Sequence, residues 1–106
     1  MTAFVFRLLP PRPSFPTDMT EAERATMLEH VDYWTALAHQ GRALAFGPVA
    51  DPRGAYGLGI VVADSLAEAE ALRDGDPAVR SPHGFSTEMV PMVRLVTPDA
   101  VYEMTG

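Results

Sequence analysis

The amino-acid sequence predicts a single α+β domain with two helices on one face of an antiparallel sheet. Four short runs of apolar and β-favouring residues predict strands, and two runs with apolar residues at helical spacing predict helices. Their order along the chain is β-α-β-β-α-β, which is typical of the ferredoxin-like arrangement. The predicted strands cover residues 3–9, 43–50, 56–63 and 86–96, and the predicted helices cover residues 20–41 and 66–73.

Length and composition agree with one globular domain over residues 1–106. A chain of 106 residues can bury one modest core but not two. A hydrophobic share of 47% with a charged share of 21% is ordinary for a folded protein and atypical of a disordered one. The chain contains no cysteine, which excludes disulfides, thiolate nucleophiles and thiolate metal ligands.

Net charge and the N-terminal segment bear on partners and location. The 14 acidic residues outnumber the 8 basic ones and the net charge is -6, so a nucleic acid or an anionic membrane would be repelled. We therefore expect neither as a partner. Residues 1–9 are apolar but too short to span a bilayer, and they lack the cationic region and cleavage site of a signal peptide. These features predict a cytoplasmic protein.

A proline-rich loop follows the first predicted strand. Residues 10–18 contain four prolines and a serine, which prevent regular strand pairing. The loop is long for so small a domain. A segment of this kind could lie over the mouth of a pocket.

The first helix carries an N-terminal signal and one apolar face. Thr20 followed by Glu23 is a capping-box pattern, in which the threonine oxygen accepts from a backbone N–H and the glutamate reaches back. Gly41 predicts the end of the helix. The charged side chains lie opposite an apolar face, which comprises Met27, Val31, Trp34, Leu37 and Ala38.

A hairpin and a second helix follow. The sequence Asp-Pro-Arg-Gly at residues 51–54 favours a tight reversal between two apolar strands. Ser65 is suited to cap the second helix, which ends in Asp-Gly-Asp-Pro at residues 74–77.

The remaining segments are predicted with less regular structure. Residues 78–85 contain a proline and a glycine and are predicted to be irregular. Residues 86–96 are predicted to be the last strand, in which Pro91 indicates an edge or a bulge. Residues 97–106 are predicted to form a C-terminal tail.

The predicted sheet has a second face that its two helices do not cover. Residues 43–46 and 58–62 carry apolar side chains toward both faces of the sheet. A second copy of the chain could cover this face, because a self-complementary surface makes a two-fold interface without further sequence. We therefore expect a homodimer.

Five short motifs occur in a recognisable order along residues 4–93. Each motif alone is weak, but their order and spacing together resemble the YCII-related family. The motifs are Met-Thr-Glu-Ala-Glu-Arg at residues 19–24, Glu29-His30, Tyr33-Trp34, Gly47-Pro48 and Asp76-Pro77.

The resemblance implies a dimeric α+β barrel, similar to small barrel enzymes such as muconolactone isomerases. It also implies that His30 and Asp76 form an active-site pair. Most members of the family have no assigned reaction. The chain departs from the family pattern in its proline-rich insertion and at residues 81–84, Ser-Pro-His-Gly, where an alanine-glycine pair is expected. Both departures affect the shape of the pocket.

His30 is the sharpest candidate among individual residues, because helical spacing places it on the apolar face beside Trp34. Its titration near neutral pH suits general acid or base catalysis, and an aspartate at its second nitrogen would fix the tautomer. The alternative is a core histidine that is hydrogen-bonded to the backbone. For Asp76 the alternative is a turn residue whose carboxylate accepts from nearby amides.

Other residues are candidates for binding a substrate. Arg7 could clamp the carboxylate of an organic acid, although it could equally be an edge arginine. His83 lies in a loop and could assist binding, or it could be solvated. The substrate-binding candidates are Arg7, Trp34, Gly47, Pro48 and His83.

No metal or cofactor is predicted, because neither a metal-ligand spacing nor a phosphate-binding glycine loop occurs. Two functions remain open. One is a lyase, isomerase or hydrolase that acts on a small molecule such as an organic acid through His30 and Asp76. The other is a non-catalytic protein that binds a metabolite or modulates a partner.

Overall fold

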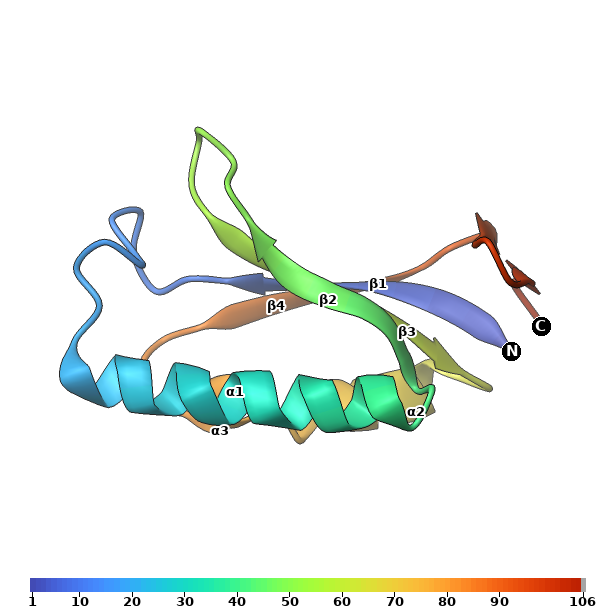
Figure 1. Ribbon diagram of the computed structural model, residues 1–106, viewed down its shortest axis with the longest axis horizontal. Helices are drawn as coiled ribbons and strands as arrows, with labels where there is room; N and C mark the ends of the chain where they lie inside the picture. The colour runs from blue at the N-terminus through green and yellow to red at the C-terminus, as the bar shows by residue number, and fades with distance from the viewer. Residues whose placement is uncertain (106) are drawn as a thin grey trace.

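A four-stranded antiparallel sheet forms the centre of the computed structural model, which describes residues 1–105 (Figure 1). The strands lie in the order β2-β3-β1-β4, so that β1 and β3 are flanked on both sides. The predicted antiparallel α+β class is confirmed. The elements are β1 Thr2–Leu9, α1 Glu21–His39, β2 Ala43–Val49, β3 Tyr56–Ala63, α2 Leu66–Asp74, α3 Pro77–Arg80, β4 Ser86–Pro91, β5 Arg94–Val96 and β6 Val101–Glu103.

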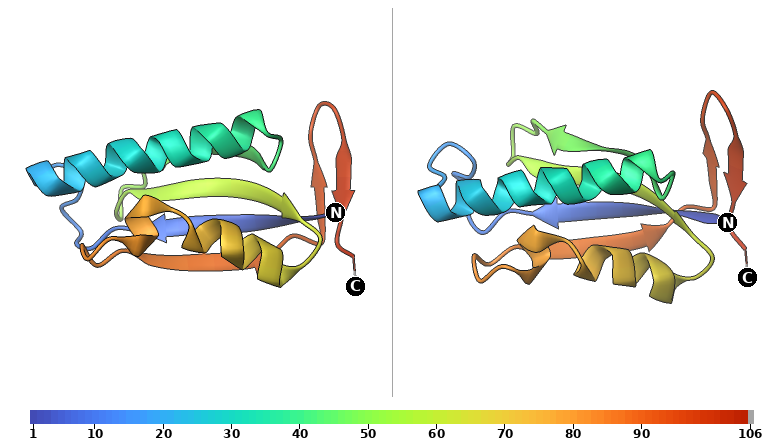
Figure 2. Two further views of the ribbon diagram at one scale, coloured as in Figure 1. Left: turned by 90° about the horizontal axis from the view of Figure 1, so that it is seen from below. Right: turned by 60° about the horizontal axis from the view of Figure 1, so that its bottom comes forward.

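All three helices lie on the same side of the central sheet (Figure 2). Alternate residues of β1, Phe4, Phe6 and Leu8, point toward them and are almost completely buried. Trp34 of α1 stacks on Phe6 with ring centroids 5.1 Å apart. Among residues 1–105, no helix is both long enough and apolar enough to cross a membrane.

The predicted capping box of α1 is present. Thr20 accepts a hydrogen bond from the backbone N–H of Glu23, and the carboxylate of Glu23 accepts one from the backbone N–H of Thr20 at 2.8 Å. The helix ends at His39, and Gly41 follows with a φ of 75°, a conformation that favours glycine.

The proline-rich loop is fixed to the start of α1 by ionic hydrogen bonds. Both terminal nitrogens of the Arg12 guanidinium donate to the carboxylate of Glu23 at 2.7 Å. The Nε of Arg12 donates to Asp18, whose carboxylate also accepts from Ser14 at 2.6 Å. This network holds the loop in a position where the ring of Phe15 is buried, with 7% of its surface exposed.

The end of the chain differs from the prediction of one long strand over residues 86–96. That strand ends at Pro91, which pairs with Phe4 near the start of β1. One more backbone hydrogen bond follows, from Met92 to Ala3, which is one residue from the start of β1 at Thr2. The chain therefore turns, and β5 pairs with β6 in a separate two-stranded sheet.

Two other predictions were wrong for related reasons. The predicted tail over residues 97–106 contains β6, because Thr97 and Ala100 close a turn that returns the chain to β5. The segment predicted to be irregular begins with helix α3, because Asp76 caps its first turn and Pro77 occupies its first position, where a missing N–H costs nothing.

The face of the sheet away from the helices carries an apolar row. Val5 of β1 pairs with Ile60 of β3 and with Val90 of β4, and Ile60 pairs in turn with Ala45 of β2. Directly paired residues of antiparallel strands lie on the same face, so these four side chains form one row across the sheet. Within residues 1–105 no helix covers this row (Figure 2).

We predict that Glu23 carries part of the acid sensitivity of the fold. Hydrogen bonds from the Arg12 side chain and from the Thr20 backbone lower the pKa of Glu23 from 4.5 to about 2. A carboxyl with a lowered pKa stabilises the native state above its unfolded pKa and loses that effect as the pH falls. The free energy of unfolding should therefore decrease between pH 4.5 and about pH 2.

Replacement of Glu23 by Gln tests this prediction, because glutamine can still accept from the cap but carries no charge for Arg12. Urea unfolding at several pH values should show a smaller acid-dependent loss of stability for Glu23→Gln than for the wild type. Glu29→Gln, at an exposed position, is the control and should follow the wild type. An unchanged acid profile of Glu23→Gln would disprove the role of this ion pair.

Candidate active site

Asp76 is the buried anchor of the candidate site. It lies between α2 and α3, where it caps α3, and none of its surface is exposed. Its carboxylate accepts three hydrogen bonds, from the backbone N–H of Ala78 at 2.8 Å, from the indole N–H of Trp34 at 2.8 Å and from the ring of His30. Three donors compensate for the loss of water around an ionised carboxylate.

His30 contacts Asp76 through one nitrogen only. Its Nδ1 lies 2.9 Å from both carboxylate oxygens of Asp76. An ionised carboxylate can only accept, so Nδ1 carries the proton and donates. In the neutral ring, Nε2 then has a free lone pair. Within residues 1–105 it makes no hydrogen bond, and 12% of the side chain is exposed.

Neighbouring residues on α1 and α2 hold this arrangement in place. Trp34 lies one helical turn after His30 and is 1% exposed, so both rings point to the same side of α1. The hydroxyl of Tyr33 donates to the backbone carbonyl of Leu72 in α2. Burial raises the pKa of Tyr33, and the nearby Asp76 carboxylate raises it further.

Gly75 leaves room for Tyr33 beside Asp76. A Cβ atom at position 75 would collide with the hydroxyl of Tyr33. The backbone immediately before Asp76 can therefore lie against α1 only because this residue has no side chain. This close approach explains the glycine in the Asp-Gly-Asp-Pro segment, which the sequence indicated only as the end of the second helix.

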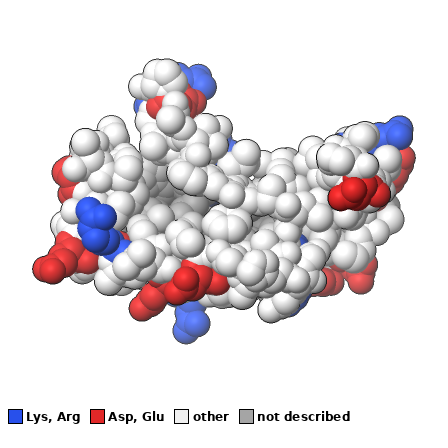
Figure 3. Space-filling view, viewed as in Figure 1, with Lys and Arg blue, Asp and Glu red and all other residues white. Residues whose placement is uncertain are grey.

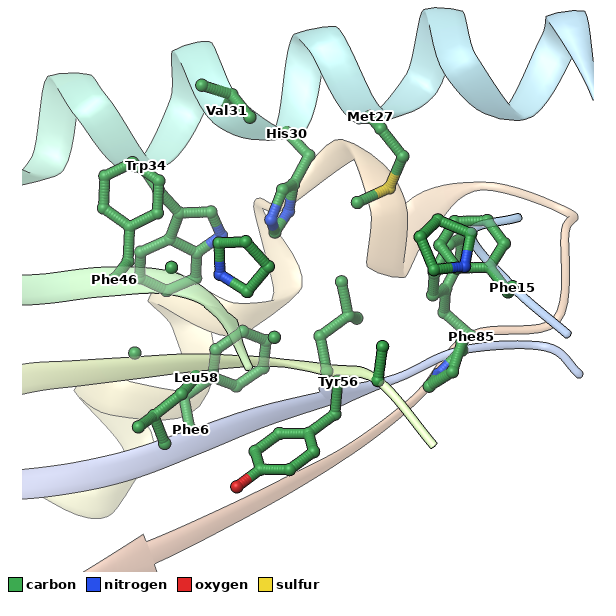
Figure 4. A pocket seen from close by; sticks show the side chains of 18 of the residues that line it. Phe6, Phe15, Met27, His30, Val31, Trp34, Phe46, Tyr56, Leu58 and Phe85 are labelled. Atoms are coloured by element: carbon green, nitrogen blue, oxygen red, sulfur yellow. The ribbon is translucent and has the colours of Figure 1, made fainter. Parts of the chain in front are cut away.

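An apolar cavity of about 270 Å³ lies next to His30, between α1 and the sheet (Figure 4). His30 and Met27 point into it from α1. Phe15 of the proline-rich loop and Phe85 meet edge to face at one end, with ring centroids 5.4 Å apart. The proline-rich loop, which the sequence indicated could lie over the mouth of a pocket, forms part of the wall through Pro10, Phe15 and Pro16. Aromatic and aliphatic groups make up most of the remaining wall, including Phe6, Leu8, Val31, Phe46, Tyr56 and Leu58.

Charged groups are missing from the wall of this cavity. Its lining includes no Lys, Arg, Asp or Glu side chain among residues 1–105, and the imidazole of His30 is its main titratable group. Figure 3 shows the molecule from outside, with charged atoms along the lower edge, at the ends and on the projection at the top, and mostly uncharged atoms around the hollow. The cavity is thus an apolar space with one imidazole ring at its side.

The structure brings together most of the residues that the sequence indicated. His30, Trp34, Gly47 and Pro48 line the cavity, and Asp76 lies directly behind His30. The prediction that Asp76 could reach the side of the first helix therefore corresponds to the observed geometry.

Arg7 and His83 lie apart from this group. Arg7 lies in a second, more polar hollow that also includes Asp51 and Tyr56. There its guanidinium donates to Glu88 at 2.6 Å and stacks over the Tyr56 ring. The Nε2 of His83 lies 3.0 Å from the hydroxyl of Thr26, and His83 is not part of the cavity wall.

Sequence reasoning missed the aromatic end of the cavity and the ion pair that positions it. Phe15 and Phe85 are large apolar residues in segments that otherwise consist of turn formers, and this was a detectable signal for burial. The pairing of Arg12 with Glu23 gave no such signal, because it depends on how the loop folds back.

Over residues 1–105, no group of three or more His, Asp or Glu side chains is arranged to bind a metal ion.

Comparison with known proteins identifies the family of the chain. No curated protein matches the sequence. A family model described as the YCII-related domain matches residues 3–93, a span that includes all of the central sheet except Thr2, together with α1, His30 and Asp76. Since the match covers most of the chain, the protein belongs to the YCII-related domain family.

Proposed function

We propose that the protein is a small-molecule enzyme in which His30 acts as general acid and base and Asp76 positions it. The observation that carries this proposal is the orientation of the His30 ring: Nδ1 is bound to a buried carboxylate, and Nε2 borders an apolar cavity. This is the arrangement in which a carboxylate fixes the tautomer of a histidine and stabilises the imidazolium that forms when Nε2 accepts a proton.

The chemistry that fits this geometry is proton transfer at a bound substrate. The Nε2 of His30 would take a proton from an acidic O–H or C–H group and return it to another atom of the same molecule or to a leaving group. Proton removal and return of this kind serve isomerisation, elimination and some hydrolyses. None of these steps requires a cofactor.

A second candidate function is binding without turnover. It is favoured by the low number of polar groups around the cavity, because a hydrolase or lyase usually also places donors near the developing negative charge. A single imidazole and an apolar wall are sufficient to hold a metabolite.

Turnover distinguishes these two functions and provides a prediction for His30. A panel of small cyclic ketones, phenols and esters can be incubated with the protein in heavy water and followed by proton NMR. Conversion or hydrogen exchange at one compound should fall at least about a hundredfold in His30→Gln, because general acid-base catalysis contributes that much. His39→Gln, at the exposed end of α1, should retain full activity. Equal rates for His30→Gln and the wild type would reject the catalytic role.

A further prediction concerns Asp76→Asn. The amide group can accept at only one atom, so its NH₂ must face either the indole N–H of Trp34 or the backbone N–H of Ala78, and in both orientations it lies beside Nδ1 of His30. We expect the His30 tautomer to invert, with the proton on Nε2, and the protein to lose about 1–3 kcal/mol of stability from an unsatisfied buried donor. Long-range proton–nitrogen NMR reports the tautomer, and urea unfolding reports the stability. An unchanged tautomer in a folded variant would contradict the positioning role.

We also propose that two copies of the chain assemble through the uncovered face of the sheet. The apolar row of Ala45, Ile60, Val5 and Val90 lies on this face, and Val90 is 56% exposed. The β2–β3 turn projects to the same side, away from the helices (Figure 1). A monomer would leave these apolar groups in water, and burying them against a second copy is favourable.

Light scattering tests the proposed dimer. The wild type should show twice the chain mass, and Val90→Lys should shift the equilibrium to the monomer, because it places a charge at one end of the apolar row. Leu28→Lys is the matched control, since Leu28 is an exposed apolar residue of α1 on the other side of the sheet. A wild type that is monomeric, or a Val90→Lys variant as dimeric as the control, would reject this interface.

A further inference from the structure

We propose that the cavity beside His30 binds uncharged compounds with one substituted ring and a hydroxyl group that donates to Nε2, and that it rejects carboxylates. This inference names the ligand class of the proposed active site and therefore depends on that site being the place of binding. It does not depend on turnover.

The size of the cavity limits the size of the ligand. Its volume of about 270 Å³ is larger than the roughly 150 Å³ in which an engineered apolar cavity holds benzene. It is slightly smaller than the range of about 300–1,000 Å³ that is usual for sites of drug-sized ligands. A single ring with one or two small substituents fits this space.

The residues that line the cavity limit the charge of the ligand. A carboxylate that enters the cavity loses water and meets no arginine or lysine, since none lines the wall. A protonated His30 would not solve this problem, because Asp76 already neutralises the imidazolium. The cluster of Asp76, His30 and a bound carboxylate would carry a net negative charge in an apolar environment.

The tautomer of His30 determines which partner donates in the hydrogen bond with the ligand. Because Asp76 accepts from Nδ1, the free Nε2 of the neutral ring can only accept. A ligand hydroxyl can donate to it, whereas an ether oxygen at the same place would leave both atoms without a partner. The cavity should therefore prefer a phenol or enol to its methyl ether.

This ligand class differs from the organic acid that Arg7 indicated in the sequence. Arg7 could have supplied the missing positive charge, but it belongs to the second hollow, where Glu88 binds it. Arg7 and His30 therefore do not line the same cavity.

Three matched probes test the proposal: para-trifluoromethyl phenol, its methyl ether and para-trifluoromethyl benzoate. Fluorine NMR titrations near neutral pH measure the dissociation constant of each compound. We expect the phenol to bind about tenfold more tightly than the ether, which is the effect of one hydrogen bond, and the benzoate to show no saturable binding. The proposal is overturned if the benzoate binds as tightly as the phenol, or if the phenol and the ether bind equally.

Two variants show whether the probe occupies this cavity. Met27→Trp adds bulk at a side chain that points into the cavity, and it should weaken binding of the phenol and the ether alike. His30→Phe keeps the ring volume but removes the acceptor, and it should abolish only the preference for the phenol. Full binding of the phenol by folded Met27→Trp would also overturn the proposal. A failure of every turnover assay, combined with the expected probe selectivity, would reject the enzyme and support this ligand class.

Discussion

The buried carboxylate of Asp76 is the interaction on which the site depends. It joins the middle of α1, through His30 and Trp34, to the start of α3, through Ala78, although His30 and Asp76 are 46 residues apart in the sequence. Helix α2 ends two residues before Asp76. A carboxylate without exposed surface is stable only with several donors. The same three hydrogen bonds therefore cap a helix, orient a tryptophan and fix the tautomer of a histidine.

The apolar cavity follows from how the surrounding elements cover the sheet. Helix α1 begins beyond the edge of the strands, and the proline-rich loop returns over its first turn through the ion pair of Arg12 with Glu23. Phe15 and Phe85 close one end, and Trp34 with Phe6 fills the other. Between these aromatic pairs, the glycines of β3 leave space that larger side chains would occupy. His30 is the polar group that faces this space from α1.

Much of the fold could be predicted because its signals are local. The capping box at Thr20, the glycine after α1 and the alternation in β1 each specify an element without long-range information. The end of β4 could not be predicted, since β4 ends near the point where its pairing partner β1 begins. His30 could be selected because an imidazole on an apolar helix face is unusual, whereas the place of Arg7 depends on which face of the sheet it occupies.

The measurement that tests the central claim most directly is the nitrogen spectrum of His30 in the wild-type protein, recorded without and with para-trifluoromethyl phenol. Long-range proton–nitrogen correlations should show the proton on Nδ1 in both states, held by Asp76. Addition of the phenol should shift the Nε2 resonance and leave the Nδ1 resonance nearly unchanged, because the ligand hydroxyl contacts only Nε2. A proton on Nε2 in the free protein, or no response of Nε2 at saturating phenol, would contradict the account.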